Sequence, residues 1–305
     1  MNALPDVQHS NARPDTGSVF QTARNVVSIF KLRIGFMITV TALAGVIVTP
    51  GPALGWAKLT VLLLAVLASS ASAGAFNQYY ERVSDRLMAR TRGRVFATGE
   101  IPDHPAWLAL FAVMLSVAVL AAAWVLNPVS AGFVFLGAFF YAVVYTVWLK
   151  RRSAMNIVVG GLAGSFAVLA GAAAVDVALG PLPILMALVL FLWTPPHFWS
   201  LAIAGHAEYA AAGVPMLPVV VGIPRAARIV MWSTIALAVT ALLPGFFGAG
   251  LVYMAGALAG GGHFVWRSVQ LARRPSRKTA MAAFFASLIQ LSLLLGAAAL
   301  DSLLR

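Results

Sequence analysis

Long apolar segments separated by short polar connections make up almost the whole chain. Each segment approaches or reaches the roughly 20 apolar residues that an α-helix needs to cross the hydrocarbon core of a bilayer. Because backbone in lipid must satisfy its own hydrogen bonds, uninterrupted segments of this length favour helices over barrel strands. The pattern therefore predicts an all-α integral membrane protein with nine transmembrane helices. These cover residues 34–49, 56–76, 105–126, 129–149, 156–175, 181–203, 226–246, 249–266 and 279–299.

The first 28 residues differ from the rest of the chain. They hold scattered prolines and polar residues and show no apolar period. We therefore expect a mobile cytoplasmic tail at residues 1–28 and a single membrane domain at residues 29–305. The tail lacks the basic-then-apolar order of a cleavable signal peptide, so we expect the first spanning helix to direct insertion.

Composition and charge agree with a membrane location. The chain of 305 residues is 61% hydrophobic and 10% charged, with a mean hydropathy of +0.90, whereas soluble domains carry about 25% charged residues. The net charge of +12 would suggest a nucleic-acid partner in a soluble protein. Here the retention of basic residues in cytoplasmic loops accounts for it, and we expect no nucleic-acid partner.

The distribution of basic residues also predicts the topology. With nine spans and a cytoplasmic N-terminus, all but Lys58 and Arg305 of the 21 lysines and arginines fall on the cytoplasmic side. The C-terminus then lies outside. The chain has no cysteine, which excludes disulfides, thiolate metal sites and cysteine catalysis.

The most charged stretch of the chain, residues 77–94, directly follows the second apolar segment. Asn77, Glu81 and Asp85 are four residues apart, and on a helix each step of four turns the side chain by only about 40°, so the three share one face. Three oxygen-bearing side chains on one face can hold a hard divalent cation. Arg90 and Arg94 belong to a basic row beside them, which suits a metal-bound anion such as a diphosphate. A solvated loop between two hydrophobic helices is the alternative.

The other main polar clusters fall on the same predicted membrane face, so we expect the active site at the cytoplasmic end of the bundle. The fourth segment ends at Lys150 and Arg151, which either set the topology or contact a phosphate. The sixth segment contains Pro195-Pro196, which breaks or kinks the helix. The next residue, His197, either lines a cavity or makes a structural hydrogen bond. The loop that follows is either an ordinary connector or a second source of metal and proton-transfer groups, and its polar candidates are His206, Glu208 and Tyr209.

These segments resemble one known family, in the same order along the chain. The UbiA-type intramembrane prenyltransferases have a first aspartate-rich motif that resembles residues 77–94, NQYYERVSD followed by RLMARTRGR, in the form used by heme O synthases (protoheme IX farnesyltransferases). A second family segment is similar to YTVWLKRRSAMNIVVGGLAG. Two elements specific to heme O synthases resemble WTPPHFW and AGVPMLP. The resemblance runs from about residue 28 to the C-terminus and includes nine spans with the N-terminus inside.

The resemblance implies a function and a set of site residues. The implied reaction joins the farnesyl group of farnesyl diphosphate to a vinyl group of heme B (protoheme IX), with addition of water, to give heme O for a terminal oxidase. The implied location is the bacterial inner membrane, and the implied partners are membrane lipid and either heme A synthase or the oxidase. Mg²⁺ is the implied cofactor, held by Asn77, Glu81 and Asp85, with heme B as substrate. Arg90 and Arg94 complete the implied catalytic set. The implied substrate-binding residues are Tyr145, Lys150, Arg151, His197, His206, Glu208 and Tyr209.

The chain also departs from the family pattern. Glu81 stands where the family usually has Asp, and its carboxylate reaches one carbon further. Two alternative functions stay open. One is a UbiA-type prenyltransferase for a different aromatic or tetrapyrrole acceptor, which predicts a second Asp-x3-Asp motif that residues 204–225 lack. The other is a non-catalytic heme-binding assembly protein built on the same helices.

Overall fold

A computed structural model describes residues 16–304, and within them every regular element is helical, which confirms the all-α prediction. The elements are α1 (Thr16–Ile29), α2 (Leu32–Val48), α3 (Trp56–Asp85), α4 (Val95–Thr98), α5 (Ala106–Val125), α6 (Pro128–Phe139), η1 (Phe140–Leu149), α7 (Asn156–Gly160), α8 (Leu162–Val175), α9 (Pro181–Ala204), α10 (His206–Ala211), α11 (Leu217–Val221), α12 (Ile223–Thr240), η2 (Leu243–Phe247), α13 (Leu251–Arg273) and α14 (Arg277–Leu303).

The expected tail, residues 1–28, is only partly covered by the structure. Residues 1–15 lie outside the described residues, and residues 16–28 belong to helix α1. The second half of the expected irregular tail is therefore helical. Phe20, Ala23 and Val27 recur at a spacing that places them on one face of a helix, and this short apolar period accounts for α1.

Most helices are long and apolar enough to cross a bilayer. Seven meet this requirement on their own, and the pair α1–α2, bent by 44°, adds an eighth if it is one span. Helix α13 has 23 residues, which is long enough, but His263, Arg267 and several glycines make it more polar than the others. Within the described residues, length and composition thus support seven or eight spans, and the prediction of nine depends on α13.

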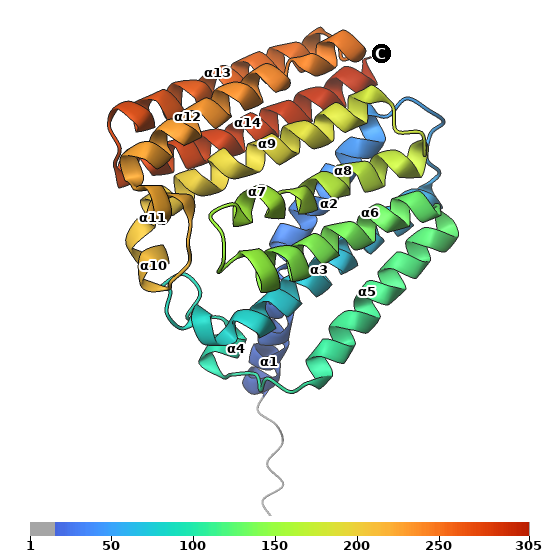
Figure 1. Ribbon diagram of the computed structural model, residues 1–305. Coiled ribbons are helices and arrows are strands. Elements are labelled where there is room, and N and C mark those ends of the chain that lie inside the picture. Colours follow the sequence, from blue (N-terminus) through green and yellow to red (C-terminus); the bar gives the residue numbers. More distant parts are fainter. Residues whose placement is uncertain (1–15, 305) are drawn as a thin grey trace, which may run out of the picture.

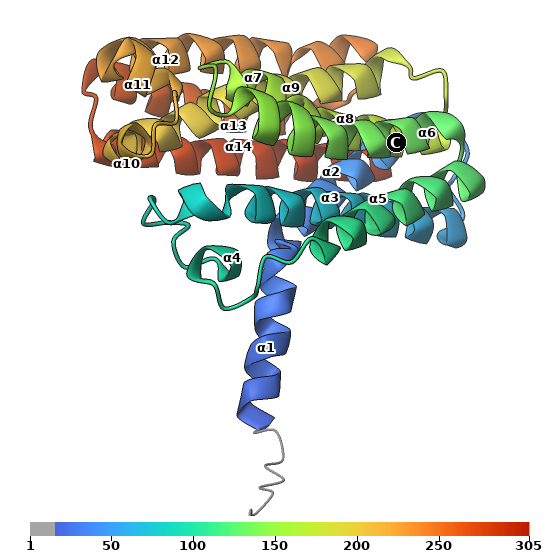
Figure 2. The same ribbon diagram turned by 60° about the horizontal axis from the view of Figure 1, so that its bottom comes forward.

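The helices pack as two groups that lie side by side (Figure 1). One group contains α2, α3, α5, α6 and α8, and the other contains α9, α12, α13 and α14. Each group has its own apolar core, and the groups meet where α8 packs on α9 and α2 on α14. Helix α1 projects from the bundle beside α4 (Figure 2).

The two ends of the bundle differ. The short helices α4, α10 and α11 gather at one end, whereas the C-terminus and the α2–α3 and α5–α6 connections lie at the other (Figure 1). The last turns of α3 and the end of η1 lie at the end that carries the short helices. This end therefore collects most of the polar segments that the sequence singles out.

Helices α2 and α8 cross at a pair of glycines that allow main-chain contact. A Cβ atom on Gly45 would collide with the carbonyl oxygen of Val168, and a Cβ on Gly171 would collide with that of Ala42. Small residues at such crossings let helix backbones approach closely in lipid, where dispersion contacts drive helix association. This contact sets how far α8 stands from α2, and α8 also packs on α9 in the second group.

We expect Gly171→Ala to destabilise the protein by about 1–3 kcal/mol, because the added methyl group meets main-chain atoms that cannot move independently. The control is Gly132→Ala in α6, where a Cβ has no neighbour within 4 Å. Unfolding in a denaturing detergent titration would measure both. Equal stability of the two variants would contradict close contact between α2 and α8.

Candidate functional site

The acid-containing row at the end of α3 is buried. Helix α3 has 30 residues, about 45 Å in length, so its last turns reach the end of the bundle that holds α4 and α10. Asn77, Glu81 and Asp85 lie on these turns and are each only 3–4% exposed. Burial to this degree is incompatible with the alternative of a solvated loop.

Three basic side chains surround the row. Lys31 Nζ donates to Asn77 Oδ1 at 2.6 Å, and Arg94 Nη1 donates to Asp85 Oδ2 at 2.6 Å. Lys150 Nζ donates to Glu81 Oε1. Each polar group of the row thus has its own cation, which offsets the large cost of burying a carboxylate.

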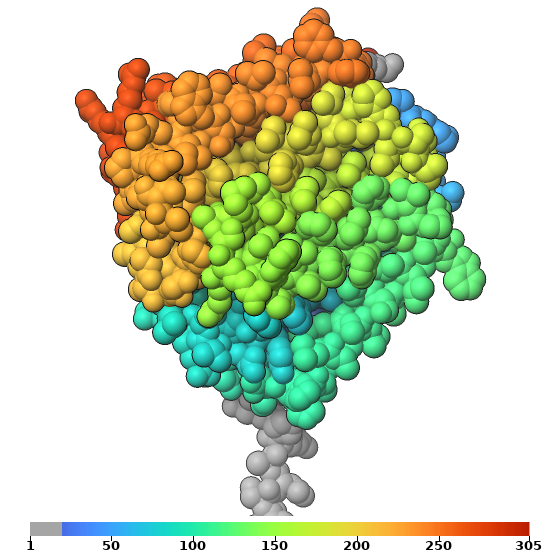
Figure 3. Space-filling model, in the orientation of Figure 1, coloured from blue at the N-terminus to red at the C-terminus, as the bar shows by residue number. Residues whose placement is uncertain are grey.

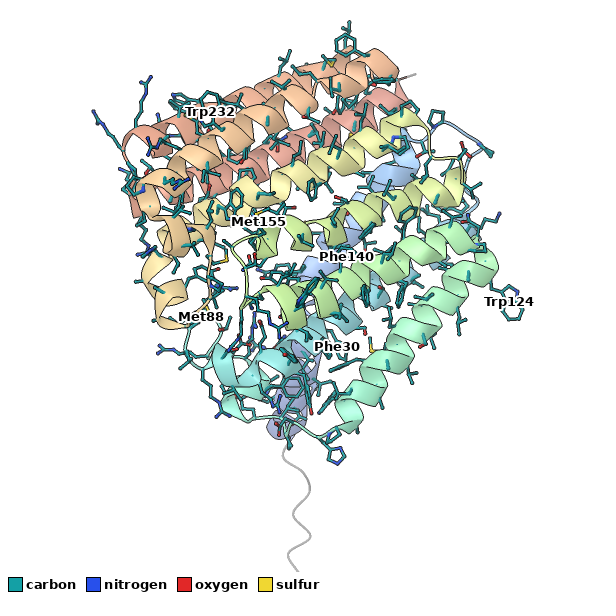
Figure 4. All side chains as sticks on the ribbon, viewed as in Figure 1. Phe30, Met88, Trp124, Phe140, Met155 and Trp232 are labelled. Carbon is teal, nitrogen blue, oxygen red and sulfur yellow. The ribbon has the colours of Figure 1, made fainter. Side chains whose placement is uncertain are left out.

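The loop after α3 folds back to supply Arg94. Thr91 Oγ1 donates to the carbonyl oxygen of Asp85, and Arg94 then returns to the carboxylate of Asp85. The same loop carries Met88, which packs with Tyr145 and Tyr209 in a small apolar cluster. Figure 4 labels Met88 in this loop, below α10. Figure 3 shows the surfaces of the α3–α4, η1–α7 and α10–α11 segments meeting on one face of the molecule.

Oxygen atoms suited to a hard cation are present in the row. Glu81 Oε2 is buried and has no hydrogen-bond partner among residues 16–304, although Arg94 Nη1 lies 4.0 Å away. Asn77, Glu81 and Asp85 together offer amide and carboxylate oxygens, the ligands that Mg²⁺ prefers. The part of the chain that the structure describes contains no cluster of three or more His, Cys, Asp or Glu side chains arranged for a metal. Two carboxylates and one amide are few ligands for a divalent ion, and Mg²⁺ commonly completes such a set with water and the oxygens of a phosphate.

The wall facing α3 is an unusual helix. Residues 140–149 form the π-helix η1, a rare winding that often occurs at functional sites. It contributes Tyr141, whose hydroxyl lies 3.3 Å from Lys31 Nζ, and Thr146, whose hydroxyl accepts from Asn77 Nδ2 at 3.0 Å. Tyr145 stacks on Tyr141 with ring centroids 5.9 Å apart. Lys150 follows directly after this helix, and burial lowers its pKa, although the adjacent Glu81 carboxylate opposes the shift.

The structure brings some of the predicted site residues together and separates others. Glu81, Asp85, Arg94 and Lys150 form one group joined by ion pairs. Asn77 lies one turn before Glu81 and bonds to Lys31 and Thr146. Lys150 Nζ lies 5.8 Å from the ring centroid of Tyr145, which shares an apolar cluster with Tyr209. By contrast, Arg90, Arg151 and Glu208 are exposed, and His206 is partly buried. None of these four has a side-chain hydrogen bond or ion pair among the described contacts.

His197 lies in a different environment. Its ring is buried between Trp193 and Phe284, with centroids 4.2 and 4.6 Å away, and Nδ1 is 2.6 Å from Ser287 Oγ. Ser287 and Phe284 belong to α14. His197 therefore joins α9 to α14 through packing and one hydrogen bond. The pair Pro195-Pro196 lies inside α9 without ending the helix.

Three site residues were not recognised from the sequence as part of the site: Lys31, Tyr141 and Thr146. Lys31 occupies the break between α1 and α2 with φ 48°, a left-handed conformation that is costly for a residue other than glycine. In the sequence it counted only as a cytoplasmic basic residue. Tyr141 and Thr146 carried no signal, because their approach to α3 depends on the π winding.

We expect Arg94→Gln to lower the free energy of unfolding by about 3–5 kcal/mol, because Asp85 would remain buried without its cation. The matched control is Arg82→Gln in the same stretch. Arg82 pairs with the exposed carboxylate of Asp103, and its hydrogen bond lowers the pKa of Asp103. The loss in this control should be much smaller, because ion pairs between exposed side chains contribute little to stability. Both are measured by denaturation of the metal-free protein, and equal losses would show that the burial of Asp85 carries no special cost.

Comparison with known proteins shows the family of this chain. The model of the UbiA prenyltransferase family matches residues 38–290, so the chain belongs to the UbiA prenyltransferase family. Within that family it is 56% identical to "Protoheme IX farnesyltransferase 2" of Paramagnetospirillum magneticum over 280 residues, which cover 92% of this chain and 97% of that protein. It is 46% identical to "Protoheme IX farnesyltransferase 1" of the same organism over 278 residues, covering 90% and 96% of the two chains.

Solved structures share the fold at low sequence identity. A digeranylgeranylglyceryl phosphate synthase matches with a TM-score of 0.79 at 14% identity, covering 93% of this chain and all of that one. A UbiA homologue from Archaeoglobus fulgidus, determined bound to GPP and Mg²⁺, matches with a TM-score of 0.65 at 15% identity, covering 87% and 97%. These likenesses establish the UbiA membrane fold for this chain.

Proposed function

We propose that this chain transfers the farnesyl group of farnesyl diphosphate to a vinyl group of heme B (protoheme IX) and so forms heme O for a terminal oxidase. The observation that carries the proposal is the identity of 56% and 46% with two proteins named protoheme IX farnesyltransferase, over at least 90% of this chain. The buried row of Asn77, Glu81 and Asp85 with its surrounding bases supplies the chemical rationale.

In this proposal Asn77, Glu81 and Asp85 hold Mg²⁺. The support is their shared face, their burial and the Glu81 oxygen without a hydrogen bond. When bound, the ion would neutralise charge on the diphosphate and make it a better leaving group. Glu81 in place of the usual Asp keeps the carboxylate chemistry, and in this structure one of its oxygens is already paired with Lys150.

Basic residues around the row bind the diphosphate. Arg94 and Lys150 contact the acids directly. They are therefore placed to pair with the negative charge of the diphosphate that the ion does not neutralise. Arg90 and Arg151 are exposed at the same end of the bundle and reach the anion from the solvent side.

The rest of the site holds the chain and the acceptor. When the C–O bond to diphosphate breaks, the allylic cation must be kept from water until the vinyl carbon attacks it, and the burial of the row inside the bundle supports that protection. Tyr141 and Tyr145 belong to the π-helix beside the row, and the faces of their stacked rings stabilise the positive charge of the allylic cation. Water then adds to the second vinyl carbon, and a proton is released.

Heme B binds on the side of α9 and α10. Tyr209, in α10, packs in the same cluster as Tyr145 and Met88 and is the best supported acceptor contact. His206 and Glu208 lie on the same short helix and remain candidates for polar groups of the heme. His197 also remains a candidate, but its place between Trp193 and Phe284 favours a packing role.

The proposal includes nine spans in a bacterial inner membrane, with the N-terminus and the site cytoplasmic. The support is the seven or eight apolar spans, the length of α13 and the basic residues at the end of the bundle that holds the site. If α13 crosses the membrane, three spans separate the α8–α9 connection from the α13–α14 connection. These two connections then face opposite sides.

We expect Ala178→Cys to react with a membrane-impermeant maleimide from outside intact cells, and Pro275→Cys to react only in inverted vesicles. The chain has no native cysteine that would give a background, and both positions are exposed. Labelling of both positions from the same side would mean that α13 lies on the membrane surface and that the chain has eight spans.

We expect purified protein supplied with heme B, farnesyl diphosphate and Mg²⁺ to form farnesylated heme, detected by mass. Glu81→Ala and Asp85→Ala should each lower turnover by at least about 10³-fold, because several kcal/mol of charge stabilisation are lost, while heme binding followed by absorbance is retained. The matched control, Asp103→Ala, removes an exposed acid that pairs with Arg82 and should keep full turnover.

Other outcomes of this assay would favour one of the alternative functions or a structural role for the row. Natively folded protein that binds heme but yields no farnesylated product would support the non-catalytic assembly role instead. Loss of heme binding in both alanine variants would indicate that the row supports the structure of the site. Transfer of the prenyl group to a different aromatic acceptor, but not to heme B, would favour another UbiA-type reaction.

A further inference from the structure

The amide of Asn77 is held in one orientation by two partners of opposite kind. Its oxygen accepts from Lys31 Nζ at 2.6 Å, and its nitrogen donates to Thr146 Oγ1 at 3.0 Å. An amide oxygen and an amide nitrogen are nearly the same size, so the hydrogen-bond partners alone decide which atom faces which way. Only the oxygen can serve a hard cation.

Thr146 cannot form a hydrogen bond with the Asn77 amide in the opposite orientation. Its hydroxyl donates its single proton to the carbonyl oxygen of Tyr141 at 2.8 Å. A carbonyl oxygen only accepts, so the proton is committed and Thr146 Oγ1 can only accept from Asn77. A flipped amide would set its oxygen against this acceptor, and Asn77 is too buried for water to relieve the conflict.

The π winding of η1 makes this arrangement possible. Residues five apart would lie about 140° apart around an α-helix, and residues nine apart about 180°. Yet Tyr141, Thr146 and Lys150 all contact Lys31 or the row on α3. The bond from Lys150 N to Tyr145 O, at 2.9 Å, likewise spans five residues. In an ordinary α-helix, Tyr141 and Lys150 would point in opposite directions.

We infer that Thr146 is a positioning residue, delivered by the π-helix, that keeps the Asn77 oxygen rather than its NH₂ group available to a divalent cation. The inference rests on the proposed metal site at Asn77, Glu81 and Asp85. The neutral hydroxyl of Thr146, which lies outside the charged stretch at residues 77–94, thereby contributes to metal affinity. The same role explains why this part of the bundle is wound as a π-helix.

The test measures binding of Mn²⁺, an oxygen-binding substitute for Mg²⁺, to the purified full-length protein by the EPR signal of the free ion. Thr146→Val keeps the shape of the side chain and removes the acceptor, and it should weaken Mn²⁺ binding by about 10–100-fold, as losses of partners of metal ligands do. Thr146→Ser restores the hydroxyl and should restore affinity. Thr146→Ala is a second variant without the hydroxyl.

A matched control comes from α12. Thr234 is as buried as Thr146, and its hydroxyl bonds only to the carbonyl oxygen of Val230 in its own helix. Thr234→Val therefore makes the same chemical change away from the site and should leave Mn²⁺ affinity unchanged. An equal loss in both valine variants would assign the effect to general destabilisation and overturn the inference.

A double-mutant cycle separates orientation from packing. In Asn77→Asp both side-chain atoms are oxygens, so orientation no longer matters, and adding Thr146→Val should change Mn²⁺ affinity less than about twofold. A full loss in this background would overturn the inference. Wild-type affinity in Thr146→Val, together with lost binding in Asp85→Ala, would overturn it while leaving the proposed site intact. Wild-type affinity in Asp85→Ala would instead refute the proposed metal site.

Discussion

Burial of negative charge at the end of α3 is the constraint on which the rest of this structure depends. Glu81 and Asp85 are each only 4% exposed, and an unpaired carboxylate in such a place would be far too costly to keep ionised. The protein brings basic groups to this row from three separate parts of the chain: Arg94 to Asp85, Lys150 to Glu81 and Lys31 to the neighbouring Asn77. The break between α1 and α2, the returning loop after α3 and the end of η1 are each arranged around this need.

Two segments with irregular backbone conformation lie against the same row. Lys31 has a left-handed conformation, and residues 140–149 are wound as a π-helix. Both are less favourable than regular helix, so neighbouring contacts must hold them. The contacts that do so include the hydrogen bonds of Lys31 and Thr146 to Asn77. The interactions that build the site and those that maintain its unusual backbone are therefore the same.

The bundle around this end serves to keep it in place and dry. One group of helices leads into the end of α3 and into η1, and the other includes α9, which leads into the short helix α10 that carries Tyr209. Close main-chain contact between α2 and α8, which Gly45 and Gly171 permit, holds together the two helices of the first group that pack on α14 and α9 of the second. In the proposed function, this is the end of the bundle where a prenyl diphosphate and a planar acceptor meet.

Features that depend on local spacing and on charge could be predicted from the sequence. Apolar length predicted a helical membrane protein, and the spacing of Asn77, Glu81 and Asp85 predicted a shared face. The residues that surround that face come from distant parts of the chain and are known from the fold alone. Lys31 is 46 residues from Asn77 and Thr146 is 69 residues away, and a π winding leaves no periodic signal in a uniformly apolar helix. The fold alone likewise shows that His197 packs against α14, because a single histidine near a proline pair does not reveal which neighbour it faces.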